Sequence, residues 1–318
     1  MRDRSIDIVS SIFIIQMVLF HIGQQAGLLD AAYYEVSIKV FACFMPWFFF
    51  KSGIFFKPQS NKETVIKEAK RALVPFVVFS LIGHICYIFV LYSKHDTNII
   101  HYTLSPIKQL LQGGSIAGNM PLWFLSSFFA VKVLFNAIYS WHKQFLLVLI
   151  AAIPYLLHIT HTELPIYYIA NISAGIFFYG CGFYLKDVLD KWYVILPCIV
   201  AFTLSLFIIP TYVDMRTNQV VLGNFYLWYP LAIAGIITFK YIFSIIDFGL
   251  STILGVVSRN SIFILCTHWI IIMLVSLILP NLTGWELFTA DVVALLVLIP
   301  ILLYLSNSVK SKILKISL

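Results

Sequence analysis

An aspartate and a histidine stand near the two ends of the first apolar stretch of the chain. The stretch IDIVSSIFIIQMVLFH runs from Ile6 to His21, with Asp7 at its second position. On a helix, fourteen steps leave a net rotation of about 320°, so Asp7 and His21 lie within roughly 40° of one face and about 21 Å apart along the axis. Ionisable groups inside a membrane are costly and usually face a cavity or a partner. This face therefore predicts a pathway or a site; the alternative is two interfacial residues at helix ends.

Four further ionisable residues fall inside apolar stretches. His84 lies in FSLIGHICYIF, His268 in SIFILCTHWIII, Lys51 in MPWFFFKSGIFFK and Lys132 in FLSSFFAVKVLF. A lone histidine in an apolar helix can be a satisfied core group with no chemical role. Several such groups in one bundle favour a functional site, because lipid cannot satisfy their hydrogen bonds.

The signatures of soluble enzymes do not occur in the sequence. It contains no G-x-S-x-G, P-loop or H-E-x-x-H motif, and no G-x-G-x-x-G after a strand. No metal-ligand spacing is present, and His158 and His161 are interpreted as turn residues. The five cysteines lie singly in apolar runs and are interpreted as small buried hydrophobes. We therefore expect no metal site.

The composition assigns most of the chain to a membrane. Hydrophobic residues make up 61% of the 318 positions and charged residues 11%, against about 45–50% and about 25% in soluble domains. A transmembrane helix needs about 20 mostly apolar residues. We predict an all-α membrane protein, a single domain over residues 1–318 with about ten transmembrane helices. The predicted spans are 6–26, 36–56, 72–92, 121–140, 144–161, 165–185, 192–211, 225–246, 258–279 and 286–306.

The cations between these spans predict the orientation. With the N-terminus in the cytoplasm, one side receives Arg2, Arg4, Lys57, Lys62, Lys67, Lys70, Arg71, Lys143, Lys186, Lys191, Arg259, Lys310, Lys312 and Lys315. The other side receives Lys39, Lys94, Lys108 and Arg216. Cytoplasmic loops carry the excess of Lys and Arg, so both termini are expected to be cytoplasmic. The net charge of +7 is explained by this orientation and not by binding of nucleic acid.

Five stretches, in order, resemble the acyltransferase-3 family of integral-membrane O-acyltransferases. They are RSIDIVSSIFIIQMVLFH, FMPWFFFKSGIFFK, KEAKRALVPF, MPLWFLSSFF and VVSRNSIFILCTHW. They are similar to the family's Asp/His first helix, its M-P-x-F-F-F-x-S-G segment, its R-x-x-x-P start of the third span, its P-L-W-F-L segment and its N-S-x-x-I-x-x-x-H helix. The branch most similar in appearance is that of the fucose 4-O-acetylase-like sugar O-acetyltransferases.

One position departs from the family pattern. The family usually carries Arg or Lys three residues after the aspartate, and this chain has Ser10 there. If that cation helps to hold the acyl donor, another residue must replace it, or activity is altered. Lys51 is expected on the same inner side and is the candidate replacement.

The resemblance implies transfer of an acyl group, most often acetyl from acetyl-CoA, to a hydroxyl of a cell-surface or lipid-linked glycan. Acyl-CoA would be a co-substrate, with no permanently bound cofactor. Coenzyme A carries phosphates, so Arg71, Lys57 and Lys51 are the expected donor-binding residues. The resemblance also implies a place in the bacterial inner (plasma) membrane.

The same resemblance suggests roles for the remaining site residues. His21 is the first candidate for a general base or a transient acyl carrier, and His268 is the second, either orienting or assisting. Asp7 would fix a cation or a helix end on the donor side. Trp123 and Asn119 are expected at the glycan, although Trp at a membrane edge is often an interfacial anchor.

Two other classes of protein remain open from the sequence. A transporter or flippase of lipid-linked sugars would also need polar groups inside a bundle. A catalytically inactive relative would explain the serine at position 10. Release of coenzyme A from acetyl-CoA separates an enzyme from both.

Overall fold

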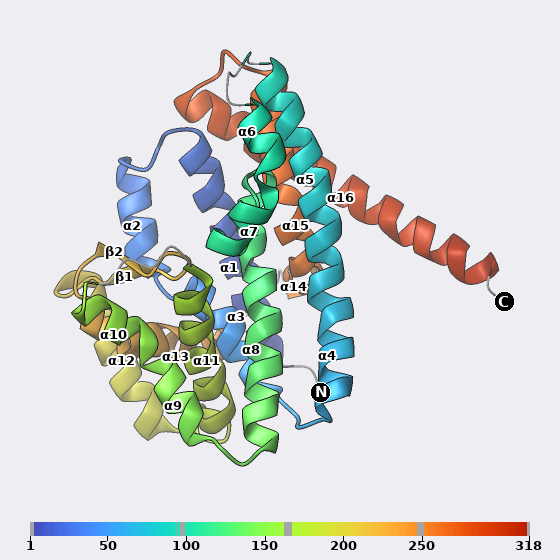
Figure 1. Ribbon diagram of the computed structural model, residues 1–318. Helices are drawn as coiled ribbons and strands as arrows, with labels where there is room; N and C mark the ends of the chain where they lie inside the picture. Colours follow the sequence, from blue (N-terminus) through green and yellow to red (C-terminus); the bar gives the residue numbers. More distant parts are fainter. Residues whose placement is uncertain (1–2, 94, 96–98, 162–166, 247–250, 317–318) are drawn as a thin grey trace.

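The computed structural model describes residues 3–93, 95, 99–161, 167–246 and 251–316 (Figure 1). Arg2, Lys94 and the first two residues of the predicted span 165–185 lie outside the described part, as do the side chains of residues 307–316. Most of the described residues are helical, in agreement with the all-α prediction. A two-stranded antiparallel hairpin, which the sequence had not indicated, joins two of the helices.

The elements of the first half of the chain are α1 (Arg4–Gln25), α2 (Ala32–Val40), α3 (Phe44–Ile54), α4 (Asn61–Glu68), the π-helical turn η1 (Ala69–Leu73), α5 (Val74–Ser93), α6 (Ile99–Leu104), α7 (Pro106–Gly113), the 3₁₀ turn η2 (Ala117–Leu122) and α8 (Trp123–Ser140). Those of the second half are α9 (Phe145–Ala151), α10 (Ile153–Ile159), α11 (Tyr167–Leu185), α12 (Trp192–Phe207), β1 (Tyr212–Asp214), β2 (Gln219–Leu222), η3 (Phe225–Leu227), α13 (Trp228–Ile245), α14 (Ser251–Arg259), α15 (Ser261–Ile278) and α16 (Gly284–Ile316).

Seven helices of the described chain are long and apolar enough to cross a membrane, so the count of ten is not confirmed. The predicted span 36–56 is divided into α2 and α3 by a turn at residues 41–43. The predicted spans 144–161 and 192–211 correspond to shorter apolar helices, Phe145–Ile159 and Trp192–Phe207. Pro154 explains one break, because a proline fits the first turn of α10 and cannot continue α9.

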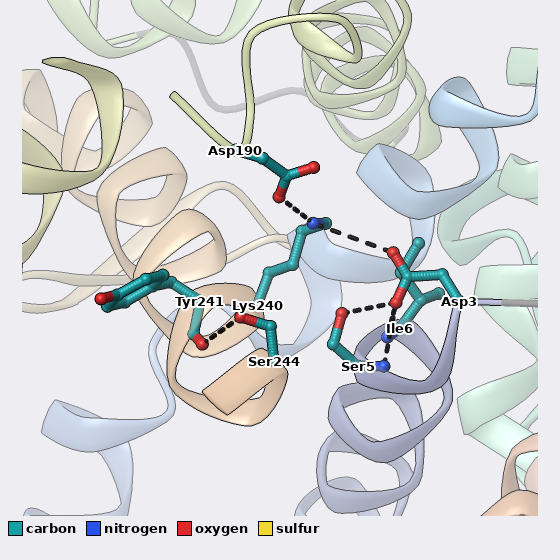
Figure 2. Close-up of polar contacts among 7 residues, drawn as sticks. All are labelled: Asp3, Ser5, Ile6, Asp190, Lys240, Tyr241 and Ser244. Atoms are coloured by element: carbon teal, nitrogen blue, oxygen red, sulfur yellow. Dashed lines mark hydrogen bonds and ion pairs between the residues drawn. The ribbon is translucent and has the colours of Figure 1, made fainter. Parts of the chain in front are cut away.

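The start of α1 is fastened to two other parts of the chain. Asp3 caps the helix, accepting from the Ser5 backbone N–H at 2.9 Å. Figure 2 shows Asp3 and Asp190 turned toward the Lys240 ammonium, at 3.8 and 2.6 Å. Lys240 lies near the end of α13, and Asp190 lies in the connection before α12. The N-terminus and this connection, which the cation pattern assigns to one side, therefore lie at one end of the bundle.

Helix α1 runs through the middle of the core. Its Phe13 meets Trp47 of α3 and Phe239 of α13 edge to face, with ring centroids 6.0 and 5.1 Å apart. Close helix crossings elsewhere depend on glycine. Gly83 of α5 and Gly118 of η2 face each other, and a Cβ on either would collide with the backbone of the other. Small residues let backbones approach in this way in membrane proteins, and this crossing fixes the position of η2.

The helix from α4 to α5 contains a π-helical turn for a local reason. Pro75 has no N–H to bond the carbonyl of Arg71, four residues earlier, and its ring crowds that carbonyl. The strain is absorbed in η1, directly before the proline. This turn carries Arg71 of the R-x-x-x-P segment, so the proline of the motif shapes the backbone that presents the arginine.

Candidate active site

Two histidines that are 247 positions apart meet in the bundle. His21 of α1 and His268 of α15 have ring centroids 5.4 Å apart, tilted by 32°. The Trp269 ring stands edge to face against His21, also at 5.4 Å. His268 is fully buried, whereas His21 keeps some exposed surface. The structure thus brings together the two histidines that the sequence had selected separately.

The hydrogen bonds of His268 indicate its tautomer. Its Nδ1 lies 3.0 Å from the Ile264 carbonyl oxygen. A carbonyl only accepts, so Nδ1 donates, and in the neutral ring Nε2 carries the lone pair. Among the described residues, the buried His268 Nε2 and His21 Nδ1 have no hydrogen-bond partner. Such atoms are unusual in a folded interior.

Asn119 binds the backbone of α15 close to His268. Its Nδ2 donates to the Cys266 carbonyl oxygen at 2.9 Å, two residues before His268, and its side chain is fully buried. Trp123 is buried at the start of α8 and packs edge to face on Phe124, with ring centroids 6.2 Å apart. The structure therefore places Asn119 against α15 and Trp123 in the core, and their contact with the glycan stays a prediction.

A pocket of about 260 Å³ lies on one side of this pair. Its polar lining includes five cations and one acid: Lys51, Lys57, Lys67, Arg71, Lys132 and Glu68. Its apolar lining includes Met17, Met45, Phe48, Phe124, Phe128 and Leu265. All three donor-binding residues expected from the sequence line this one pocket. A pocket with exposed cations and an apolar, aromatic wall fits a ligand that is anionic at one end and apolar at the other.

The pocket ends one helical turn from the histidines. Met17 lines it on α1, and His21 follows four residues later, a rise of about 6 Å. Leu265 lines it on α15, and His268 follows three residues later, a rise of about 4.5 Å. On both helices, the pocket and the histidine pair are therefore about one helical turn apart.

Ser10 and Lys51 are in direct contact. Lys51 Nζ lies 2.7 Å from Ser10 Oγ, and Trp47 Nε1 donates to the same oxygen at 3.0 Å. The Ser10 hydroxyl in turn donates to the Ile6 carbonyl oxygen at 2.6 Å. The serine that departs from the family pattern thus holds an ammonium group at its own position on α1.

Lys132 and Glu68 form a largely buried ion pair in the pocket wall. Their N–O distance is 2.6 Å, and their side chains are 11% and 4% exposed. Lys132 also lies over the Phe128 ring, 5.2 Å from its centroid. This pair compensates one of the five cations, so the remaining four leave the pocket strongly positive.

Asp7 lies away from the histidines, about 21 Å along α1 from His21. Its Oδ1 accepts from Ser258 Oγ at 2.9 Å, and Ser11 one turn later donates to the Leu254 carbonyl. Both contacts fasten α1 to α14. Asp7 therefore contacts α14 through Ser258, and its role on the donor side stays a prediction.

Sequence reasoning missed several residues of this region. Trp269 was passed over because apolar stretches contain many aromatic residues, and Trp47 for the same reason. Asp291 of α16 is fully buried, and neither carboxylate oxygen has a hydrogen-bond partner among the described residues. An acidic residue inside the last apolar stretch was the available signal. Arg216 was counted only as a loop cation.

A helical membrane bundle that places a cationic pocket against a histidine pair has the parts of a membrane acyltransferase. The family model described as an acyltransferase domain matches residues 3–306, nearly the whole chain, so the chain belongs to this acyltransferase family and is an acyltransferase. No curated protein and no solved structure matches the chain.

Proposed function

We propose that the protein transfers an acyl group, acetyl first among them, from acyl-CoA to a hydroxyl of a cell-surface or lipid-linked glycan. The observation that carries the proposal is the cationic pocket that ends one helical turn from His21 and His268. The resemblance to the fucose 4-O-acetylase-like branch supports a sugar as the acceptor.

The pocket suits coenzyme A in two respects. Lys57, Lys67 and Arg71 are exposed at the pocket and match the donor's phosphates. The apolar wall of Met17, Phe124 and its neighbours matches the pantetheine arm and the acyl group. The thioester would then lie close to the histidine pair.

The chemistry needs one proton acceptor beside the thioester carbon. A histidine nitrogen takes the proton from the acceptor hydroxyl, the hydroxyl oxygen forms a bond to the carbonyl carbon, and the carbon–sulfur bond breaks. The departing thiolate of coenzyme A then receives the proton. The half-buried His21 is the proposed base or transient acyl carrier, and the Nδ1–H tautomer of His268 supports an assisting role.

The test is acyl transfer by membranes that contain the protein and are given acetyl-CoA labelled in the acetyl group. We expect free coenzyme A thiol and alkali-labile label on glycan, in equal amounts. His21→Ala should lower the rate by about 10²–10⁴-fold while the protein still elutes as a single species in detergent.

If the His21→Ala protein keeps more than about a tenth of the normal rate, His21 is not the base, and His268 takes that role. If normal protein releases no coenzyme A and labels no glycan, the acyl-CoA proposal fails. Movement of lipid-linked sugar without acyl transfer would indicate a flippase.

We also propose that the protein lies in the bacterial inner membrane with both termini in the cytoplasm. The cation pattern of the connections supports this orientation. Reporter fusions at Leu318 and near Asn98 should then give opposite locations. Reporters on the same side at both positions would contradict the proposed orientation.

A further inference from the structure

Two oxygen atoms in the wall of the cationic pocket have no hydrogen-bond partner among the described residues. They are Glu68 Oε2 and Thr64 Oγ1. Both residues line the pocket, and both are buried, with exposed fractions of 3% and 7%. A buried polar atom without a partner costs free energy, so most such atoms in folded proteins are hydrogen-bonded. The pocket is therefore the place from which a ligand can supply the missing partners.

The two side chains lie one turn apart on α4. They are separated by four residues, so they share one face of the helix, with a rise of about 6 Å between them. Asn136 of α8 donates to the Gln59 carbonyl oxygen at 3.0 Å and to Asn61 Oδ1 at 2.9 Å, which binds the start of α4 to α8. The face that carries Thr64 and Glu68 is thus held at the pocket by the neighbouring helix.

The chemistry of Glu68 restricts what can bind its second oxygen. Oε1 lies 2.6 Å from Lys132 Nζ, so the ion pair is neutral as a whole. A carboxylate only accepts hydrogen bonds, so a partner of Oε2 must bring an N–H or an O–H. A phosphate at neutral pH offers acceptors and negative charge, and it does not fit there. The exposed cations of the pocket, Lys57, Lys67 and Arg71, match the phosphates instead.

The pantetheine arm of coenzyme A has the groups that these two oxygens need. Between the thioester and the phosphates it carries two amides and one hydroxyl, joined by apolar links. Each of these three groups can donate to Glu68, and the Thr64 hydroxyl can pair with a neighbouring amide because it both donates and accepts. The aromatic wall of Phe124 and Phe128 suits the apolar links.

The size of the pocket favours the arm over the nucleotide. Its volume is about 260 Å³, below the range of about 300–1,000 Å³ for pockets that enclose a drug-sized ligand. Coenzyme A is larger than such a ligand, so only part of it fits inside. The proposed reaction puts the thioester at the histidine pair, so the part inside is the arm, and the nucleotide lies at the exposed cations.

We propose that Glu68 and Thr64 bind the pantetheine arm of the acyl donor, Glu68 through an N–H or O–H of the arm and Thr64 through a neighbouring amide. This inference rests on the proposed function and adds to it a site for the uncharged part of the donor. The donor is then recognised by its arm as well as by its phosphates.

The first experiment removes the Thr64 hydroxyl and compares two donors, acetyl-CoA and S-acetyl-pantetheine, which lacks the nucleotide. Thr64→Val keeps the shape of the side chain and should lower kcat/KM by about 2- to 12-fold, as expected for one neutral hydrogen bond, by the same factor with both donors. Thr64→Ser keeps the hydroxyl and should recover most of this loss. Thr203→Val is the matched control, because the exposed Thr203 hydroxyl bonds the Ile199 carbonyl oxygen of its own helix, α12.

The second experiment tests the contact with Glu68 by removing hydrogen-bond donors from the ligand one at a time. Three analogues of S-acetyl-pantetheine are compared: two with an ester oxygen in place of one amide N–H, and one without the hydroxyl. In normal protein at least one analogue should lower kcat/KM by at least about tenfold, as expected for a hydrogen bond to a charged group. In the double variant Glu68→Leu with Lys132→Met, the same analogue should react as well as S-acetyl-pantetheine itself. Both residues are replaced so that neither charge is left buried alone.

Three outcomes would overturn the inference while acyl transfer from acetyl-CoA stays normal, with rates normalised to protein that elutes as a single species. The first is an unchanged kcat/KM in Thr64→Val with both donors. The second is a loss in Thr64→Val that occurs with acetyl-CoA and not with S-acetyl-pantetheine, which would assign the hydroxyl to the nucleotide. The third is that every analogue has effects of equal size in normal protein and in the double variant. Absence of any transfer from acetyl-CoA by normal protein would instead refute the proposed function, and this inference with it.

Discussion

Replacement of Lys51 tests whether the ammonium held by Ser10 binds the acyl donor. Lys51→Met removes the charge and keeps most of the length of the side chain. Lys51 Nζ lies 2.7 Å from Ser10 Oγ, and Lys51 lines the cationic pocket. A hydrogen bond to a charged group contributes about 1.5–3 kcal/mol, so the KM for acetyl-CoA should rise by roughly 10- to 150-fold. Ser10→Ala loses only the neutral contact that positions the ammonium, about 0.5–1.5 kcal/mol, and should raise the KM by roughly 2- to 12-fold.

An exchange of the two residues makes the test sharper. The double variant Ser10→Lys with Lys51→Ser keeps the atoms of the pair and moves the cation onto α1, where the family usually carries it. We expect it to recover at least a third of the loss seen in Lys51→Met, since the charge returns to the same part of the pocket.

The assay is the initial rate of coenzyme A release at increasing acetyl-CoA, normalised to protein that elutes as a single species. Lys39→Met is the matched control, because Lys39 pairs with Glu35 on α2, away from the pocket. A normal KM in Lys51→Met would refute the donor role. A loss of kcat alone would show that the ammonium acts on the reaction and not on donor binding.

Three further predictions follow from the pocket and its supports. Arg71→Ala should raise the KM for acetyl-CoA by at least about tenfold, whereas Lys70→Ala, which alters an exposed neighbour outside the pocket lining, should leave it unchanged in the same assay. Glu68→Gln or Lys132→Met alone should lower the free energy of unfolding in detergent by about 3–5 kcal/mol, and the double variant by much less, because each single change strands a buried charge; additive losses would contradict a coupled pair. Gly118→Ala should reduce turnover per folded molecule and cost about 1–3 kcal/mol of stability, because its Cβ meets the backbone of α5; normal turnover would show that the position of η2 does not matter.

The sequence predicted the class of fold and the histidines because both depend on local signals. An apolar composition indicates a membrane bundle. An imidazole in an apolar membrane helix costs free energy however that helix packs, so its position can be read from the sequence. The number of spans was not predictable in the same way. The mean hydropathy of residues 36–56 reflects their apolar side chains. It gives no signal for the turn at residues 41–43, where the backbone changes direction inside the apolar run.

The partners of the site residues depend on how helices pack, which one sequence does not reveal. Lys51 was named only as a candidate replacement for the cation missing at position 10, from its expected place on the inner side of the membrane, and its hydrogen bond to Ser10 was not predicted. The glycan contact expected of Asn119 stays a prediction, and its bond to the Cys266 carbonyl oxygen was not predictable because a backbone acceptor leaves no mark in a sequence. Arg216 was counted as a loop cation, and its contact with Met120 depends on a hairpin of seven strand residues with little pattern of its own.

The π-helical turn before Pro75 limits how the length of the chain can change. Thr64, Lys67, Glu68 and Arg71 line the pocket from one face of α4 and η1. Deletion of one residue within Ala69–Leu73 would restore a regular helix and turn most of this face by about 100° relative to α5. The helix would gain regular backbone hydrogen bonds, but the cations on this face would no longer line the pocket. The additional residue of the π-helical turn therefore restricts insertions and deletions. Ser60 caps α4, and relatives that keep this pocket should keep the spacing between Ser60 and Pro75, whatever substitutions accumulate between them.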